Sequence, residues 1–203
     1  MSLKWMVCGN ARHGKDTVSL YLTVVYGLQY ESSSLFVCRR FIFDRLAPLY
    51  GYTSVEECYA DRGNHRKEWF DLIVEYNGEH LDRVSREIFE EHDIYCGLRN
   101  IDELNASKAN KTHDFEIWVD ASKRKSLEPA TSLTITADDC SHYVDNNGTL
   151  IELFENVDTL MQTVGTHPVP FSGLNVHAIE THLPDPLERA YFTRALLEHL
   201  ELA

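Results

Sequence analysis

The chain has 203 residues, 43% of them hydrophobic, which is enough for one buried core in a single domain. Its 19 basic residues are outnumbered by 32 acidic ones, and the formal net charge of −13 opposes non-specific binding of nucleic acid. No apolar run approaches the roughly 20 residues of a membrane span, and the start MSLKW lacks a signal-peptide pattern. We therefore expect a cytoplasmic protein that does not bind membranes.

The hydrophobic pattern switches repeatedly between strand and helix periods. In chain order we expect a strand at 5–9, a helix at 15–27, a strand at 34–38, helices at 39–50, 54–60, 64–76 and 80–91, a strand at 94–98, a helix at 101–109, strands at 115–120 and 142–145, a helix at 149–163 and a last helix at about 186–201. This alternation predicts an α/β fold with a central, mostly parallel five-stranded sheet covered by helices on both faces.

Three details of this pattern can be checked directly. In the helix at 80–91, the side chains expected to face the core are Leu81, Val84, Ile88 and Phe89. The sequence Asn146-Asn147-Gly148 predicts a tight turn with a positive φ angle. The five cysteines are scattered without C-x-x-C or metal-ligand spacing, which predicts reduced thiols in the core.

The motif G-x-x-x-x-G-K, from Gly9 to Lys15, lies between the first strand and the first helix. Glycine-permitted backbone lets several N–H groups converge on phosphate oxygens, and the lysine adds a positive charge near the β- and γ-phosphates. The alternative is an ordinary turn between a strand and a helix. We expect the nucleotide phosphates to be bound by Gly9, Asn10, Ala11, Arg12, His13, Gly14, Lys15, Asp16 and Thr17.

The residue after the lysine departs from the usual motif, which has a serine or threonine that ligates Mg²⁺. Here Asp16 takes that place and Thr17 follows, and we expect one of the two to hold Mg²⁺. The aspartate could hold the ion directly or through water, or it could orient the acceptor. Asp120, at the end of a predicted strand, could serve Mg²⁺ through water or cap the turn.

Phosphoryl transfer needs cations around the transferred group, so arginines near strand ends are candidates. Arg99 follows the strand at 94–98, and the alternative is an ion pair with Glu103. Arg62 and Arg66 lie at the start of a predicted helix, where they could grip an acceptor phosphate or sugar or form local ion pairs.

Two loops at the same edge of the sheet complete the candidate site. Lys123-Arg124-Lys125 could belong to a lid over ATP, or could be a simple basic loop. Asn147 and Gly148 could line the adenine pocket in addition to making a turn.

With these features the chain resembles the P-loop kinases of the bacteriophage deoxynucleoside monophosphate kinase type. The segments that carry the resemblance are GNARHGKDTV, IYCGLRNIDELNA, FEIWVD and YVDNNGTLIELFENV, which together span roughly the first 160 residues. The ending D-N-N-G-T-L-x-E-L is also found in dephospho-coenzyme A kinases. The segment ECYADRGNHRKEWFDLI is similar to the phage nucleotide kinases that include the 5-hydroxymethyl-deoxyuridine DNA kinases.

The resemblance implies a P-loop kinase-type three-layer fold, with ATP and Mg²⁺ at residues 9–17 and Arg99 close to the transferred phosphate. It also implies acceptor contacts near Arg62 and Arg66. We expect a kinase domain at 1–164, a helical insertion at about 39–91 that binds the acceptor, and a C-terminal extension at 165–203. For a phage-encoded chain, the location would be the host cytoplasm.

The predicted activity is transfer of the ATP γ-phosphate to a deoxynucleotide, either free or within DNA. We favour the hydroxymethyl group of 5-hydroxymethyl-deoxyuridine in DNA, for which Asp16 could act as a base. One alternative is a deoxynucleoside monophosphate kinase, which the acidic net charge favours. Others are a regulatory module that binds ATP without turnover and a protein whose tail docks a partner. A homodimer is left open.

Overall fold

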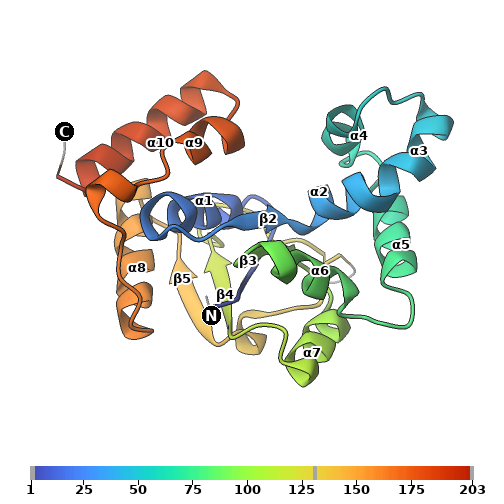
Figure 1. Ribbon diagram of the computed structural model, residues 1–203, viewed down its shortest axis with the longest axis horizontal. Helices are drawn as coiled ribbons and strands as arrows, with labels where there is room; N and C mark the ends of the chain where they lie inside the picture. Colours follow the sequence, from blue (N-terminus) through green and yellow to red (C-terminus); the bar gives the residue numbers. More distant parts are fainter. Residues whose placement is uncertain (1–2, 130–131, 202–203) are drawn as a thin grey trace.

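Figure 1 shows the computed structural model, which describes residues 3–129 and 132–201. Its centre is a five-stranded sheet with the strand order β2-β3-β1-β4-β5 and parallel pairing throughout. The strands are β1 (Trp5–Cys8), β2 (Tyr30–Ser32), β3 (Ile94–Leu98), β4 (Phe115–Asp120) and β5 (His142–Asp145). The predicted three-layer α/β fold is therefore confirmed.

The helices that surround the sheet mostly match the predicted ranges. They are α1 (Lys15–Tyr26), α2 (Ser33–Val37), a π-helix (Cys38–Ile42), α3 (Phe43–Tyr50), α4 (Val55–Asp61), α5 (Arg66–Asn77), α6 (Arg83–Glu91), α7 (Ile101–Asn110), α8 (Leu150–Thr163), α9 (His177–His182) and α10 (Pro186–His199). Gly27 ends α1 in the left-handed conformation, and the Ser54 hydroxyl accepts a hydrogen bond from Glu57 N at the start of α4. The short helix α9 was not predicted.

The prediction of a strand at 34–38 is wrong. These residues form most of α2 and begin the π-helix, and the strand of this unit is Tyr30–Ser32 instead. Phe36 and Val37 are buried in the hydrophobic core that also contains Met6 and Cys8 of β1. A five-residue apolar run has the same appearance in a buried strand and in one side of a short helix, so periodicity alone cannot separate the two.

Two smaller predictions are also corrected. Leu81 precedes the first residue of α6 and is 42% exposed, because the helix begins three residues later than predicted, at Arg83. The turn after β5 needs no positive φ, since Gly148 is not among the positive-φ glycines. Instead, a Cβ on this glycine would collide with the Glu152 carboxylate, which accepts hydrogen bonds from Thr149 at the start of α8.

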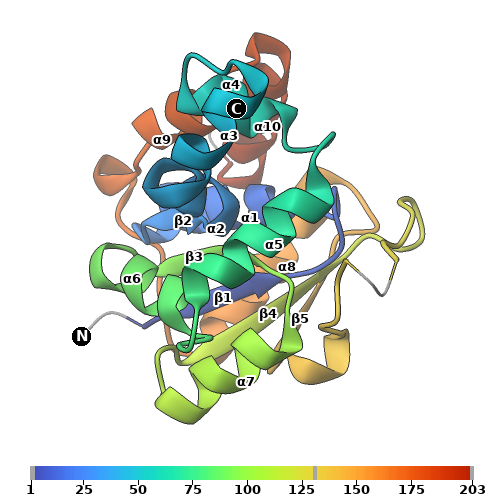
Figure 2. The ribbon, with the colours of Figure 1, turned by 90° about the vertical axis from the view of Figure 1, so that its right-hand side faces the viewer.

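Alternating side chains of β1 enter two separate cores. Trp5 and Val7 face the core formed with α1, α8 and α10, whereas Met6 and Cys8 face the core formed with α2, α6 and α7. In Figure 2, helices α5, α6 and α7 lie in front of the sheet on this second side. Because helices cover both faces, the carboxyl edge of the strands is the place where loops can form a site.

The C-terminal extension packs on its own chain. Phe192 of α10 contacts Phe154 of α8 at a ring distance of 5.4 Å, and the His199 ring nitrogen lies 2.8 Å from the Asp158 carboxylate. Tyr21 and Tyr26 of α1 also donate hydrogen bonds to Asp158. Residues of α9 and α10 thus complete the core on the α1 side, at the opposite end of the molecule from α3 and α4 (Figure 1).

Four of the five free cysteines are buried, as predicted for core thiols, and Cys140 is half-buried. Among the described residues, no helix has the length and apolar character needed to cross a membrane.

Candidate functional site

The loop between β1 and α1 requires glycine at both of its motif positions. Gly9 has φ 142° and Gly14 has φ 95°, a region that L side chains rarely adopt. A Cβ on Gly9 would lie less than 3.0 Å from the Val119 carbonyl oxygen, and one on Gly14 would lie equally close to the Asn146 amide nitrogen. The loop is therefore pressed against the ends of the neighbouring β4 and β5 segments.

Lys15 is held beneath this loop. Its side chain is buried, and its ammonium donates a 2.7 Å hydrogen bond to the carbonyl oxygen of Asn10. Burial lowers the pKa of Lys15, and the nearby Arg99 charge lowers it further. The lysine and the first turn of α1 together place positive potential at the carboxyl edge of the sheet.

A buried amide network ties the loop to the segments after β4 and β5. The His13 ring is fully buried and accepts a 2.9 Å hydrogen bond from Ala121 N. Asn146 Nδ2 donates to the His13 carbonyl oxygen at 2.8 Å, while the Arg124 guanidinium donates to both Asn146 oxygens at 2.6 and 2.7 Å. Sequence reasoning assigned no such role to Asn146, although its place directly after a strand was a usable signal.

Asn147 and Asp120 lie beside this network and bond to each other. Asn147 Nδ2 donates to Asp120 Oδ2 at 3.2 Å, and Asn147 Oδ1 accepts from Lys123 N at 2.8 Å. The Asp120 carboxylate also accepts from the Ser122 hydroxyl at 2.8 Å and from the Tyr143 hydroxyl at 2.9 Å. These contacts are those of a residue that caps the turn after β4.

The segment that follows Lys123-Arg124-Lys125 crosses the P-loop. Glu128 N donates to Asn10 Oδ1 at 2.8 Å, and the Ser126 carbonyl oxygen lies 3.3 Å from His13 Nε2. The Glu128 carboxylate accepts a 2.6 Å hydrogen bond from Ala11 N. Nothing in the sequence singled out Glu128, because an isolated glutamate in a loop carries no motif.

Two of the predicted arginines converge on the Glu128 carboxylate. Arg99 Nη1 donates to its two oxygens at 2.8 and 2.9 Å, and Arg66 Nη1 donates at 3.2 Å. The alternative of an Arg99–Glu103 pair is wrong, since Glu103 is buried on α7 and accepts from Tyr95 instead. Arg66 on α5 and Arg99 after β3 thus define one anion position beside the P-loop.

Arg62 does not reach this anion position. Its guanidinium lies over the Tyr59 ring at 3.8 Å and donates to the Tyr59 carbonyl oxygen at 2.9 Å. Arg39 is likewise engaged in an ion pair with Glu31 at 2.7 Å. The structure therefore separates the three predicted arginines into two that converge beside the P-loop, Arg66 and Arg99, and one with local partners, Arg62.

Asp16 and Thr17 lie in the first turn of α1, next to Lys15. The Asp16 side chain is exposed, and the Cys96 thiol of β3 donates a long hydrogen bond to its carboxylate at 3.7 Å. The exposed carboxylate of Asp16 and the hydroxyl of the half-buried Thr17 are oxygen ligands of the kind that Mg²⁺ prefers. Asp120 fits less well, since its oxygens already accept several hydrogen bonds.

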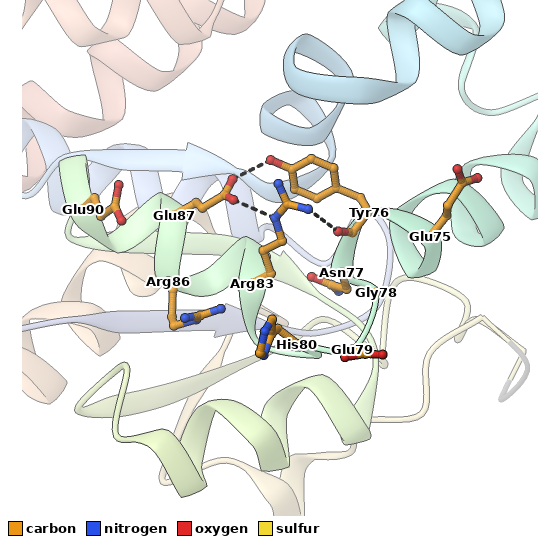
Figure 3. A pocket seen from close by; sticks show the side chains of 10 residues that line it. All are labelled: Glu75, Tyr76, Asn77, Gly78, Glu79, His80, Arg83, Arg86, Glu87 and Glu90. Atoms are coloured by element: carbon orange, nitrogen blue, oxygen red, sulfur yellow. Dashed lines mark hydrogen bonds and ion pairs between the residues drawn. The ribbon is translucent and has the colours of Figure 1, made fainter.

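A pocket of about 510 Å³ lies away from this site, at the junction of α5 and α6 (Figure 3). Its Arg83 donates to Glu87 and to the Tyr76 carbonyl oxygen, and the Tyr76 hydroxyl donates to the same glutamate. Four glutamates line it, at positions 75, 79, 87 and 90. This pocket is unsuited to an anionic nucleotide and does not touch the P-loop.

No protein-family profile and no curated protein matches the chain. A solved shikimate kinase from Aquifex aeolicus is similar with 12% identity and a TM-score of 0.48, covering 80% of this chain and 98% of that one. A sugar kinase from a Janibacter species is similar with 12% identity and a TM-score of 0.46, and the match covers 80% of this chain and 95% of that one. A gluconokinase from Sinorhizobium meliloti is similar with 10% identity and a TM-score of 0.41, and the match covers 81% of this chain and 96% of that one. At these TM-scores the likenesses carry no argument about what this chain binds.

Proposed function

We propose that the chain is a kinase that transfers the γ-phosphoryl group of ATP. One observation carries this proposal: Arg66 and Arg99 converge on a single anion position against the N–H of Ala11, beside the buried Lys15. Phosphoryl transfer depends mainly on positioning and on neutralising the charge of the transferred group. Two guanidinium groups, a lysine and loop amides at one point supply both.

In this proposal, Lys15 and the backbone amides of Gly9–Thr17 hold the β- and γ-phosphates. Arg66 comes from the helical insertion and Arg99 from the sheet edge, so the transferred group lies between the nucleotide and the acceptor. Asn147 and Gly148 after β5 and Arg124 after β4 are suitably placed to border the base of ATP. Mg²⁺, held through Asp16 or Thr17, would neutralise phosphate charge when bound.

The acceptor that we favour is the hydroxymethyl group of 5-hydroxymethyl-deoxyuridine in DNA. A hydroxyl acceptor gains from a carboxylate that removes its proton as its oxygen bonds to the γ-phosphorus and the bond to ADP breaks. Asp16 supports this choice, because its exposed carboxylate lies next to the P-loop on the side of β3. The resemblance of the segment at 57–73 to kinases of modified DNA bases supports it as well.

A deoxynucleoside monophosphate is the second candidate acceptor. It is favoured by the pairing of cations in the helical insertion, where Arg45 bonds to Glu75 and Lys67 to Asp71. Paired cations and a net charge of −13 oppose binding of a long polyanion. A phosphate acceptor is already ionised and needs no base, so this candidate predicts that Asp16 does not act as one.

The test is transfer of labelled γ-phosphate from ATP to DNA containing 5-hydroxymethyluridine and, in parallel, to the four common deoxynucleoside monophosphates. Lys15→Ala is the control for P-loop dependence, and Asp16→Asn tests the base. Label in DNA alone, lost in both variants, supports the favoured activity. Label in a monophosphate alone establishes the second candidate. Label in neither, with ATP still bound, contradicts the kinase and favours a regulatory module.

A further inference from the structure

The carboxylate of Glu128 occupies the anion position of the site. Its side chain is only 8% exposed, and its two oxygens accept from Arg99, Arg66 and Ala11 N. A surface glutamate would ordinarily keep its carboxylate in water, where a charged group is well solvated. Here a charged residue of the loop after β4 is instead buried among the donors that the proposed phosphoryl transfer requires.

The environment of Glu128 is that of a phosphate group. Burial by itself would raise the pKa of this carboxyl, but the hydrogen bond and charge of Arg99, the Ala11 N–H and the Lys15 charge outweigh it, so the pKa lies below its ordinary value. The group is therefore a full anion at neutral pH. Charge-assisted bonds of this kind are about twice as strong as neutral ones.

We propose that Glu128 is an internal competitor of the ATP γ-phosphate, which must displace it before the nucleotide binds fully. This inference rests on the proposed kinase function, because it takes ATP as the ligand. The β-phosphate is expected over the loop amides and Lys15, while the arginines mark the outer position that only a triphosphate reaches. Binding of ATP therefore requires displacement of the Glu128 carboxylate, whereas binding of ADP does not.

Through the same contact, nucleotide binding would act on the segment that contains Ser126 and Glu128. Glu128 N and Ser126 O are attached to Asn10 and His13 of the loop, so loss of the carboxylate contact loosens one of three attachments. Arg66 and Arg99 then exchange a carboxylate for a phosphate without losing an anionic partner. A ligand that binds only the opened form has its affinity reduced by the fraction of molecules already open.

The experiment measures binding of a non-hydrolysable ATP analogue and of ADP by calorimetry for wild type, Glu128→Gln and Glu128→Ala. We expect the analogue to bind about tenfold more tightly to both variants, which corresponds to about 1.4 kcal/mol. ADP affinity should change less than about twofold. Glu79→Gln removes an exposed glutamate of the α5–α6 loop and controls for net charge.

Two outcomes would overturn the inference. Unchanged binding of the analogue would show that Glu128 does not compete, and weaker binding would show that it instead holds Arg66 and Arg99 in place for the nucleotide. In both cases a wild-type protein that still binds ATP leaves the kinase proposal standing. Absence of binding of either nucleotide to wild type would instead overturn the kinase proposal itself. Glu128→Gln keeps the shape of the side chain, so it still tests the inference if Glu128→Ala misfolds.

Discussion

The P-loop region and the helical insertion are held together in different ways. Around the P-loop, hydrogen bonds join segments far apart in the chain, such as Asn146 with His13 and Glu128 with Asn10. In the insertion, polar contacts are mostly local, such as Lys67 with Asp71 and Tyr52 with Asp61. The proposed nucleotide site is therefore fixed by contacts across the whole fold, whereas the insertion, where we propose that the acceptor binds, can rearrange its own pairs.

The largest expected effect is at Gly9. Gly9→Ala places a Cβ less than 3.0 Å from a backbone oxygen that cannot move aside, so we expect loss of ATP binding and a lower melting temperature. The matched variant in the insertion is Gly63→Ala, where a Cβ meets nothing within 4 Å. Calorimetric titration with ATP should leave Gly63→Ala close to wild type. Equal damage in both variants would contradict the contrast between the two regions.

The next effect is expected at Arg99. Removing one preorganised donor from a transition-state charge costs about 10²–10³ in kcat, and we expect this loss for Arg99→Ala. Arg62→Ala is the matched control, because that guanidinium lies over Tyr59 and away from the anion position. It should change kcat by less than about fivefold in the γ-phosphate transfer assay. A larger loss for Arg62→Ala would mean that the insertion closes further onto the nucleotide than the structure shows.

A smaller effect is expected at Asn146, which links the P-loop to the segment after β4 through His13 and Arg124. Loss of a buried hydrogen-bonding group costs about 1–3 kcal/mol, so Asn146→Ala should weaken ATP binding about tenfold. Asn64→Ala, which removes a local contact with Asp61 in the insertion, should leave ATP binding unchanged. Identical ATP affinities of Asn146→Ala and wild type would show that the long-range network does not shape the nucleotide site.

The smallest effect concerns Glu103, which belongs to neither region. Burial raises the pKa of this carboxyl to about 7, above its ordinary 4.5. Between these values the folded protein keeps a proton that the unfolded chain releases, so the free energy of unfolding falls as pH rises through this window. Glu103→Gln removes this contribution. Urea unfolding at pH 5 and pH 8 should show a smaller decline for the variant than for wild type, with ATP affinity unchanged.

Most of the fold was predictable because its elements have strong local signals. The strands at 94–98, 115–120 and 142–145 were placed with the observed bounds, since all three lie between polar turns and the first two contain apolar runs. The error at 34–38 arose where the run was too short to show a period. The strand Tyr30–Ser32 that lies there has half-buried side chains at an edge of the sheet, and such a strand has little pattern to read.

The site was predictable only where a motif or a strand end marked it. Gly9, Gly14 and Lys15 follow from the spacing of the loop, and Arg99 follows from its place after β3. Arg66 could not be separated from Arg62 in the sequence, because the choice depends on how the end of α4, at Arg62, and the start of α5, at Arg66, are placed relative to the sheet. Glu128 could not be assigned, since its contacts with the loop join segments more than 100 residues apart. For Asn146, the place after a strand was a signal, but its partner His13 also lies more than 100 residues away in the chain.

The register of β1 has a consequence for how the molecule comes to be folded. Trp5 pairs with Ile94 on one side and with Phe115 on the other, so the first strand of the chain has no partner until these residues have been synthesised. The chain loses the entropy of closing these long loops before strand pairing contributes favourable free energy, and folding is therefore slow. The amide of Asn146 reaches the loop later still. During synthesis, the chain should therefore become able to bind ATP only late, after nearly three-quarters of its residues have left the ribosome.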